Sequence, residues 1–245
     1  MTRQHTYKTV DLNGTTNGYT LYGKLGSCGT VISPFTALQH LSYGVYDLII
    51  VCAWRTSWIL NALDLFKCRN VVALDGEDHQ AIHKFSLKYH RYFKRELDSY
   101  PTGNTRPISF AIPESLIVRS PPQKSGLLAH LIPGVWSTYI YETEQSYYQE
   151  YQAHVFGLTM KKGGWDCLRH YEIAMNGCLP LMRDIHQCPP YTMTTTPKDI
   201  FRQAISAFDS STTAGMDSLT LELLQHVRAH NTTKALSQYV LEESL

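Results

Sequence analysis

Two short apolar runs constrain the fold of this chain more strongly than any other feature. Residues 47–52 read Asp-Leu-Ile-Ile-Val-Cys, and residues 70–74 read Asn-Val-Val-Ala-Leu. Apolar runs without alternation are typical of strands that are covered on both faces. Residues 56–66, which lie between them, have apolar positions at helical spacing. The pattern therefore predicts a strand–helix–strand unit with parallel strands and a right-handed crossover.

The same alternation continues along the chain. Further strands are expected at 91–96, 107–112, 127–132, 153–160 and 178–182, and helices at 81–90, 142–151, 165–175, 197–207, 218–229 and 233–242. Turn-rich residues at 101–107 and 120–126 are the best linker candidates. We therefore expect an α/β protein of two Rossmann-like units, residues 1–115 and 116–245, facing each other across a cleft. The C-terminal helices are free to pack back on the first unit.

Composition excludes several classes of protein. A net charge of +1 over 245 residues gives no basis for broad electrostatic binding of nucleic acid. Six cysteines without a C-x-x-C pair predict reduced thiols, and no metal site is expected. The longest apolar run is far too short to span a membrane, and the first residues lack an apolar signal core. These features favour a cytoplasmic protein.

Residues 161–181, KKGGWDCLRHYEIAMNGCLPL, concentrate polar side chains between an expected strand and an expected helix. A glycine turn that opens a helix exposes backbone N–H groups and the positive end of the helix dipole to an anion. The residues expected to hold a diphosphate are Lys161, Lys162, Gly163, Gly164 and Arg169. Glu172 lies three residues beyond Arg169, on the same helical face, where a carboxylate can accept hydrogen bonds from ribose. The alternative is an ordinary capped helix whose apolar stripe packs on the sheet.

The same run closely resembles the nucleotide-sugar motif of a group of GT-B glycosyltransferases from large DNA viruses of algae, including chloroviruses, and from some algae and bacteria. The matching segments are 161–172, 176–180, 188–189 and 192–193, with 92–96 and 108–114 upstream, so the resemblance spans roughly residues 70–200. It implies a GT-B-like fold. It also implies that Glu172 contacts the donor ribose, while Trp165, Asp166, His170 and Asn176 shape the donor site.

The resemblance implies transfer of a sugar from a nucleoside diphosphate sugar, a co-substrate, to a hydroxyl of an oligosaccharide or glycoprotein glycan. A UDP-sugar such as UDP-xylose is favoured and a GDP-sugar is next, with viral capsid glycans as one expected acceptor and the host cytoplasm as the location. Retaining relatives commonly have a second glutamate eight positions before the first, where this chain has Gly164. An inverting reaction that requires no metal or other cofactor is therefore expected.

An inverting transfer needs a general base from the first unit. Four candidates follow the strand expected at 70–74, namely Asp75, Glu77, Asp78 and His79. They lie at the carboxyl end of a parallel strand, the edge at which α/β sheets bind ligands. Two alternatives remain open: Asp78 as a plain helix cap, and a divalent cation bound by the acids.

Lys94 and Arg95 lie at the end of another expected strand and are candidates for contacting the donor phosphate or the acceptor, with a surface ion pair as the alternative. Two further functions stay open for the whole chain: a module that binds nucleotide sugars without catalysis, and a glycan-binding protein that relies on its aromatic residues. Residues 23–29, which are rich in glycine, are expected to form a turn.

Overall fold

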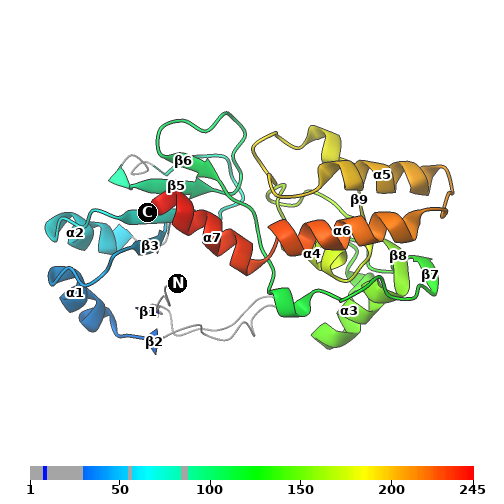
Figure 1. The fold of residues 1–245 in the computed structure, drawn as a ribbon, viewed down its shortest axis with the longest axis horizontal. Helices are drawn as coiled ribbons and strands as arrows, with labels where there is room; N and C mark the ends of the chain where they lie inside the picture. Colours follow the sequence, from blue (N-terminus) through cyan, green and yellow to red (C-terminus); the bar gives the residue numbers. More distant parts are fainter. Residues whose placement is uncertain (1–7, 10–29, 55–56, 84–87) are drawn as a thin grey trace.

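Two parallel β-sheets, one in each half of the chain, organise the fold (Figure 1). The structure is a computed structural model and describes residues 8–9, 30–54, 57–83 and 88–245. The sheet of the N-terminal half has the order β3 (Ile49–Cys52), β4 (Val71–Asp75), β5 (Arg91–Lys94) and β6 (Thr105–Pro107), and the sheet of the C-terminal half has the order β7 (Gly126–Leu128), β8 (His154–Thr159) and β9 (Leu179–Met182). All these neighbours pair in parallel. The α/β class is thus confirmed, and the sheets are compatible with a Rossmann-like fold.

A separate parallel pair, β1 (Lys8–Thr9) and β2 (Thr30–Val31), precedes the first sheet. Seven α-helices lie within the described residues: α1 (Pro34–Ser42), α2 (Ser57–Leu65), α3 (Glu144–Ala153), α4 (Leu168–Met175), α5 (Lys198–Asp209), α6 (Met216–His230) and α7 (Thr233–Ser244). Short 3₁₀ turns occur at η2 (Glu114–Leu116), η3 (Trp136–Thr138) and η4 (Ile185–Gln187). None of the described helices is both long and apolar enough to span a bilayer.

Strand β4 of the N-terminal sheet is covered on both faces, as its continuous apolar run predicts. Strand β3 is not, because Ile50 is 49% exposed and Cys52 is exposed. Successive residues of β4 face opposite sides: Val71 and Ala73 pack in one apolar cluster with Leu41 and Leu63 of α1 and α2. Val72 packs on the other side, in a cluster with Val240 of α7. This period of two follows from the pleat of a strand.

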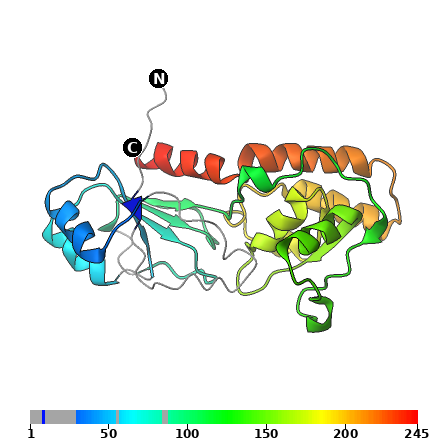
Figure 2. The ribbon, with the colours of Figure 1, turned by 90° about the horizontal axis from the view of Figure 1, so that it is seen from below.

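Helix α7 returns to the first unit after α6 has packed on the second. In both ribbon views α6 and α7 follow one another along the molecule, and α7 lies against the N-terminal half (Figures 1 and 2). The Tyr239 hydroxyl donates to the carbonyl of Pro107 at 3.0 Å, and Arg106 pairs with Glu243 at 2.7 Å. The end of the chain therefore ties the two halves together.

The C-terminal sheet also has two covered faces. Phe156 of β8 meets the ring of Phe208 at the end of α5, with centroids 5.3 Å apart. Gly157, the next residue, faces Tyr151 and Ile173, which belong to α3 and α4. A side chain at Gly157 would crowd both residues, so the two helices approach the strand closely at this point.

The chain crosses between the halves twice, and the two crossings are paired. Ile112 forms an isolated parallel bridge with Thr232, supported by Ile112 N–H to Asn231 O and Thr233 N–H to Ile112 O, both 2.9 Å. The strand expected at 107–112 is wrong for this reason: Pro107 ends β6, and the chain then leaves the sheet toward the second unit.

Three other expected elements differ from the structure. The strand expected at 127–132 corresponds to β7 and ends at Leu128, so residues 129–132 are not part of a strand. Within the range 81–90, residues 81–83 and 88–90 form no α-helix, and residues 84–87 lie outside the described part, as do residues 23–29. The helix expected to begin at Trp165 begins instead at Leu168, after an extended Cys167. The preceding backbone N–H groups are used in a contact between the two units.

Candidate functional site

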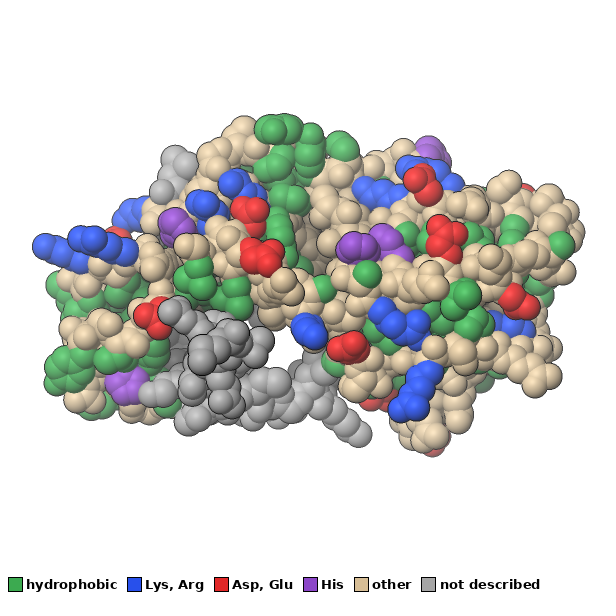
Figure 3. All heavy atoms as spheres, in the orientation of Figure 1, with side chains coloured by type: hydrophobic (Ala, Val, Ile, Leu, Met, Phe, Trp, Pro, Cys, Tyr) green, Lys and Arg blue, Asp and Glu red, His purple; other side chains and the backbone are tan. Residues whose placement is uncertain are grey.

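Three loops meet where the two units touch. They follow β4, β5 and β8, each at the carboxyl end of a parallel strand. This edge is where open α/β sheets usually bind ligands, because the strand ends and the helix N-termini converge there. Lys, Arg, Asp and Glu side chains are interspersed over the face seen in Figure 3, without one broad surface of a single sign.

The Glu96 carboxylate is the centre of the contact between the units. One oxygen accepts the Trp165 N–H and the other accepts the Asp166 N–H, each at 2.9 Å. Glu96 is only 2% exposed. Hydrogen bonds from backbone amides to an ionised carboxylate are among the stronger kinds in proteins. Glu96 therefore satisfies the backbone donors just before α4 from across the junction.

Arg95, also buried, completes this contact. Its guanidinium donates to Glu96 at 2.9 Å, to the carbonyl of Gly76 at 3.0 Å, and to the carbonyl of Asp166 and the carboxylate of Asp78. Its planar fork of donors suits such a set of converging acceptors. Arg95 thus joins the loops after β4, β5 and β8, and its expected alternative, a surface ion pair, is wrong because the side chain is buried.

The two glycines of the run permit this docking. A Cβ on Gly163 would lie 2.3 Å from an Asp78 oxygen, and one on Gly164 would lie 2.4 Å from Glu96 Oε1. The expectation that this turn cradles a diphosphate meets a physical obstacle here. The position of an anion against the Trp165 and Asp166 N–H groups is already taken by a carboxylate of the same chain.

Asp75, one of the candidate bases, is fully buried and fully bonded. Its carboxylate accepts the Trp54 indole N–H at 2.8 Å, the Tyr92 hydroxyl at 2.5 Å and the Glu77 N–H at 3.1 Å. Lys94 Nζ, equally buried, lies 3.1 Å from it. This arrangement fastens the ends of β4 and β5, and it leaves Asp75 and Lys94 without access to a substrate.

The other candidate bases lie nearer to solvent. The Asp78 side chain is 63% exposed and pairs with Arg95 beside Gly163. His79 is exposed, and its ring meets Trp54 edge-on with centroids 4.7 Å apart. Glu77 is half-buried. Of the four candidates, Asp78 is the carboxylate that is both accessible and adjacent to the run at 161–172.

Asp166 is buried at the junction, with a perturbed pKa. It accepts the Phe110 N–H at 2.8 Å and the Tyr171 hydroxyl at 2.7 Å. Burial raises its pKa from 3.8 to about 6, although both hydrogen bonds and the charge of Arg95 oppose the rise. Asp166 therefore holds the segment that links the units, and its enclosed carboxylate does not face a donor site.

His170 holds the glycine turn from the other side. Its Nε2 bonds the carbonyl of Trp165 at 2.8 Å, and its Nδ1 lies 2.8 Å from the Thr159 hydroxyl. A carbonyl can only accept, so Nε2 carries the proton. Burial lowers the pKa of His170 to about 4, which leaves it neutral near pH 7. His170 is thus a positioning residue for the turn.

Asn176 has a structural role at the end of α4. Its amide nitrogen donates to the carbonyl of Glu172 at 2.9 Å, and its oxygen accepts from Gln152 of α3 at 2.7 Å. The side chain is completely buried. Asn176 therefore joins two helices, and it does not line an open donor site.

Arg169 is the residue of the run that has buried donors without a hydrogen-bond partner among the described residues. Nη2 donates to the Tyr139 hydroxyl at 3.1 Å, while Nε and Nη1, both buried, meet no acceptor among the described residues. Lys162 approaches the same loop, because a Cβ on Gly134 would lie 3.2 Å from Lys162 Nζ. Two cations thus gather beside the loop of residues 132–140. That loop also carries Trp136, which is 81% exposed.

Glu172 lies one turn beyond Arg169, as the spacing predicts, but its carboxylate is covered. It is 1% exposed and accepts the Tyr147 hydroxyl at 2.9 Å, with the Tyr148 hydroxyl 3.4 Å away. The tyrosines come from α3. Lys161 is exposed and lies 4.9 Å from the ring centre of Trp165, which is itself mostly buried.

Several residues of this site escaped the sequence reasoning. Glu96 is the last residue of the strand expected at 91–96, and its place beside Lys94 and Arg95 was the available signal for it. The repeated tyrosines at 147, 148 and 151 were a signal for a polar aromatic cover over α4. Residues 132–140 carried no motif, and only the folded structure brings them to Arg169.

No protein-family model, curated protein or solved structure matches this chain. Its chemistry must therefore be argued from the site itself. The arrangement offers cations with free donors, an exposed aromatic loop and one accessible carboxylate near the junction.

We predict that replacing Glu96 destabilises the protein far more than replacing an exposed acid. Glu96→Ala leaves Arg95 and two backbone N–H groups without a partner in a buried place, so the free energy of unfolding should fall by about 3–5 kcal/mol. Asp64→Ala, which removes an exposed pair with Lys88, should change it by less than about 1 kcal/mol. Urea denaturation measures both, and equal effects would contradict the importance assigned to Glu96.

We also predict a pH dependence that belongs to Asp166. Its folded-state pKa of about 6 exceeds the ordinary value of 3.8, so the folded protein binds the proton more tightly. The resulting stabilisation is fully present below pH 3.8 and is lost as the pH rises through about 6. Relative to Asp166→Asn, the wild type should gain about 1 kcal/mol of unfolding free energy between about pH 7.5 and 5.5. A constant difference, or one of opposite sign, in denaturant titrations would refute this assignment.

Proposed function

We propose that this chain is a glycosyltransferase of GT-B-like architecture that takes its sugar from a nucleoside diphosphate donor. The observation that carries the proposal is Arg169, a half-buried guanidinium with two nitrogens that meet no acceptor among the described residues. Leaving buried donors of a charged group unpaired is unfavourable. An anionic ligand with oxygen acceptors, such as a diphosphate, would satisfy them.

The neighbourhood of Arg169 supports a nucleotide sugar over a free anion. Lys162 adds a second cation near Gly134, and Tyr139 lies against the guanidinium, with its ring centre 5.8 Å from Arg169 Cζ. Exposed Trp136 and Ile140 provide flat and apolar surface on the same loop. Sugars and bases pack on such surfaces, while phosphates need the cations. The combination fits a ligand with both parts.

The ribose would be held by Glu172 only after a change in its hydrogen bonds. At present its carboxylate accepts from Tyr147, and Tyr148 lies at a longer distance. The Tyr148 hydroxyl also lies 2.8 Å from Glu144, a better partner. A ribose hydroxyl would therefore take the place of Tyr148 at Glu172, with little loss to the tyrosine.

Asp78 is the base that the geometry favours. In the proposed inverting step, a glycan hydroxyl attacks the anomeric carbon as the bond from that carbon to the diphosphate oxygen breaks. Asp78 takes the hydroxyl proton, and Arg169 and Lys162 stabilise the negative charge on the leaving diphosphate. Asp78 is accessible and lies against Gly163, next to Lys162 in the chain.

The resemblance of residues 161–172 to the algal-virus glycosyltransferases extends the proposal to a UDP-sugar such as UDP-xylose, with a GDP-sugar next. It also extends it to a glycan acceptor of the viral-capsid kind. A cytoplasmic site of action belongs to the same proposal.

A second function is favoured by the state of the acidic residues. Asp75, Glu96 and Asp166 are all enclosed in internal bonds, so the junction has few carboxylates free for chemistry. A module that binds nucleotide sugars without transferring them needs no free carboxylate as a general base, and it would therefore fit a junction of this kind. The two functions share the Arg169 site and differ in whether wild-type protein releases the diphosphate.

We expect Arg169→Ala to weaken binding of UDP or GDP by about 1.5–3 kcal/mol, because a charged hydrogen bond to phosphate is lost. A thermal-shift screen of UDP, GDP and their sugars first identifies the donor, since a ligand that binds only the folded protein stabilises it. Calorimetry then compares Arg169→Ala with Arg183→Ala, which removes an exposed arginine from the same unit. If no nucleotide binds the wild type, or if both variants bind alike, the donor site is not at Arg169.

We expect Asp78→Asn to lower the release of UDP from a UDP-sugar by about 10²–10⁴-fold, since a general base contributes on that scale. Its affinity for UDP should stay unchanged, because the residue contacts the acceptor. The control is Asp98→Asn, a change of an exposed acid in the same unit. Release of UDP by wild type but equally by Asp78→Asn would exclude this base, and binding without any release would favour the non-catalytic module.

A further inference from the structure

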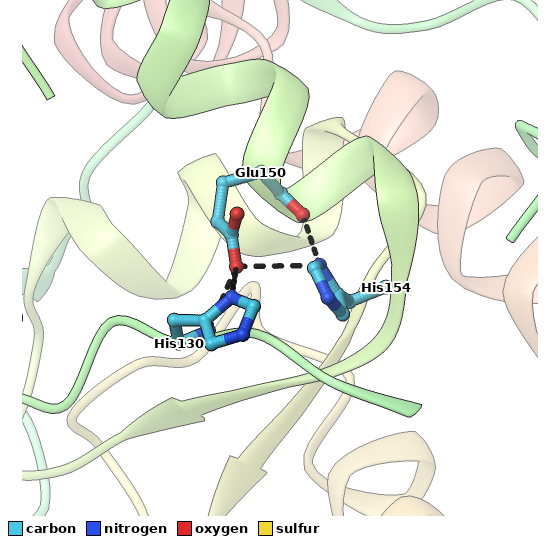
Figure 4. Close-up of side chains that lie close together, drawn as sticks. All are labelled: His130, Glu150 and His154. Atoms are coloured by element: carbon cyan, nitrogen blue, oxygen red, sulfur yellow. Dashed lines mark hydrogen bonds and ion pairs between the residues drawn. The ribbon is translucent and has the colours of Figure 1, made fainter. Parts of the chain in front are cut away.

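A cluster of potential metal ligands lies in the C-terminal unit, built from elements other than those of the junction. His130, Glu150 and His154 converge there from the segment after β7, the last turn of α3 and the first residue of β8 (Figure 4). Neither the proposed transfer nor the contact between the units uses them. Their residue types are the nitrogen and oxygen ligands that zinc takes in proteins.

The three side chains lie nearly as close together as the ligands of a bound metal ion do. His130 Nδ1 and His154 Nδ1 lie 2.8 Å and 3.3 Å from the same oxygen, Glu150 Oε1. One ligand atom from each residue lies within 4.8 Å of the other two. Ligands bound tetrahedrally at roughly 2.0–2.1 Å are about 3.3 Å apart, so only small movements are needed.

The backbone holds these side chains in place. The His130 N–H donates to Glu150 Oε1 at 2.7 Å, which fixes the segment after β7 against α3. His154 Nδ1 bonds the carbonyl of Glu150 at 2.7 Å. Its ring packs so closely on Gly126 that a Cβ there would lie 2.3 Å from the ring. The side chains of Glu150 and His154 are therefore largely fixed before a metal binds, so they lose little conformational entropy on binding it.

The surroundings suit a cation and leave it accessible. The His130 side chain is 74% exposed, whereas those of Glu150 and His154 are 13% and 11% exposed, so one side of the cluster opens to solvent. A bound cation would meet a carboxylate that is mostly shielded from water and one ring nitrogen from each histidine.

We propose that His130, Glu150 and His154 form a binding site for a divalent transition metal of the zinc class. The alternative is a cluster held by hydrogen bonds alone, in which each Nδ1 carries a proton. Metal binding requires each imidazole to carry its proton on Nε2 instead, which frees Nδ1 to coordinate the metal, and His154 gives up its bond to the Glu150 carbonyl. Three protein ligands leave a fourth position for water on the side of His130.

The metal would join the end of β7 to the corner between α3 and β8. It would thereby stiffen α3, the helix whose tyrosines cover Glu172. Its existence does not depend on the proposed glycosyl transfer, because none of the three ligands takes part in that site.

The test is a calorimetric titration of protein without an affinity tag, using Zn²⁺ alone and repeating it with Co²⁺ to observe its visible absorption. Wild type should bind one equivalent and show a raised Tm. His130→Ala, a change at an exposed side chain, should weaken binding by about 10–100-fold or more, and Glu150→Gln should do the same. His186→Ala, an exposed histidine elsewhere in the same unit, should bind as the wild type does.

The metal-free Tm of each variant shows that it is folded before titration. Absence of one-to-one binding in the wild type would overturn the proposal. Equal affinity in His130→Ala and His186→Ala would do so as well, because the bound metal would then lie elsewhere. A failure here leaves the nucleotide-sugar proposal untouched, since its readouts use no metal.

Discussion

The contact between Glu96 and the backbone before α4 is the constraint on which the junction depends. A single carboxylate accepts the N–H groups of Trp165 and Asp166, and Arg95 binds that carboxylate from its own side. Because the contact excludes any side chain at Gly164, it explains why glycine stands there. It also explains why α4 begins only at Leu168, since the N–H groups of Trp165 and Asp166 bond Glu96 and Cys167 is extended.

Buried charged residues at the junction form ion pairs with one another. Asp75 with Lys94 and Glu96 with Arg95 are buried pairs, and Asp75, Glu96 and Arg95 make further hydrogen bonds. Buried pairs of this kind add little net stability, but removal of one partner is severe. They consequently specify one docking of the two units. Because of this pairing the Asp75 carboxylate is buried, whereas the Asp78 carboxylate remains accessible to solvent.

The sequence predicted the regular elements well, because strands covered on both faces and helices with one apolar side leave clear periodic patterns. Residues 49–52, 71–75 and 154–159 form strands where these patterns indicate them. The patterns failed at 107–112 and 165–167, where an apolar or helical segment is used to join two units. Long-range partners carry no local signal. Neither Glu96 against Trp165 nor His130 against Glu150 could be read from spacing, since the partners are far apart in the chain.

The position of Arg169 changes the meaning of the motif at 161–172. If the glycine turn were the phosphate site, donor binding would require Glu96 to be displaced and the two units to separate, at the expense of a buried ion pair. Arg169 faces α3 and the loop of residues 132–140, within the second unit alone. A donor bound there would leave the Glu96 contact intact. The glycine turn then fixes the angle between the units, while the cations on either side of it, Lys162 and Arg169, remain available for a ligand.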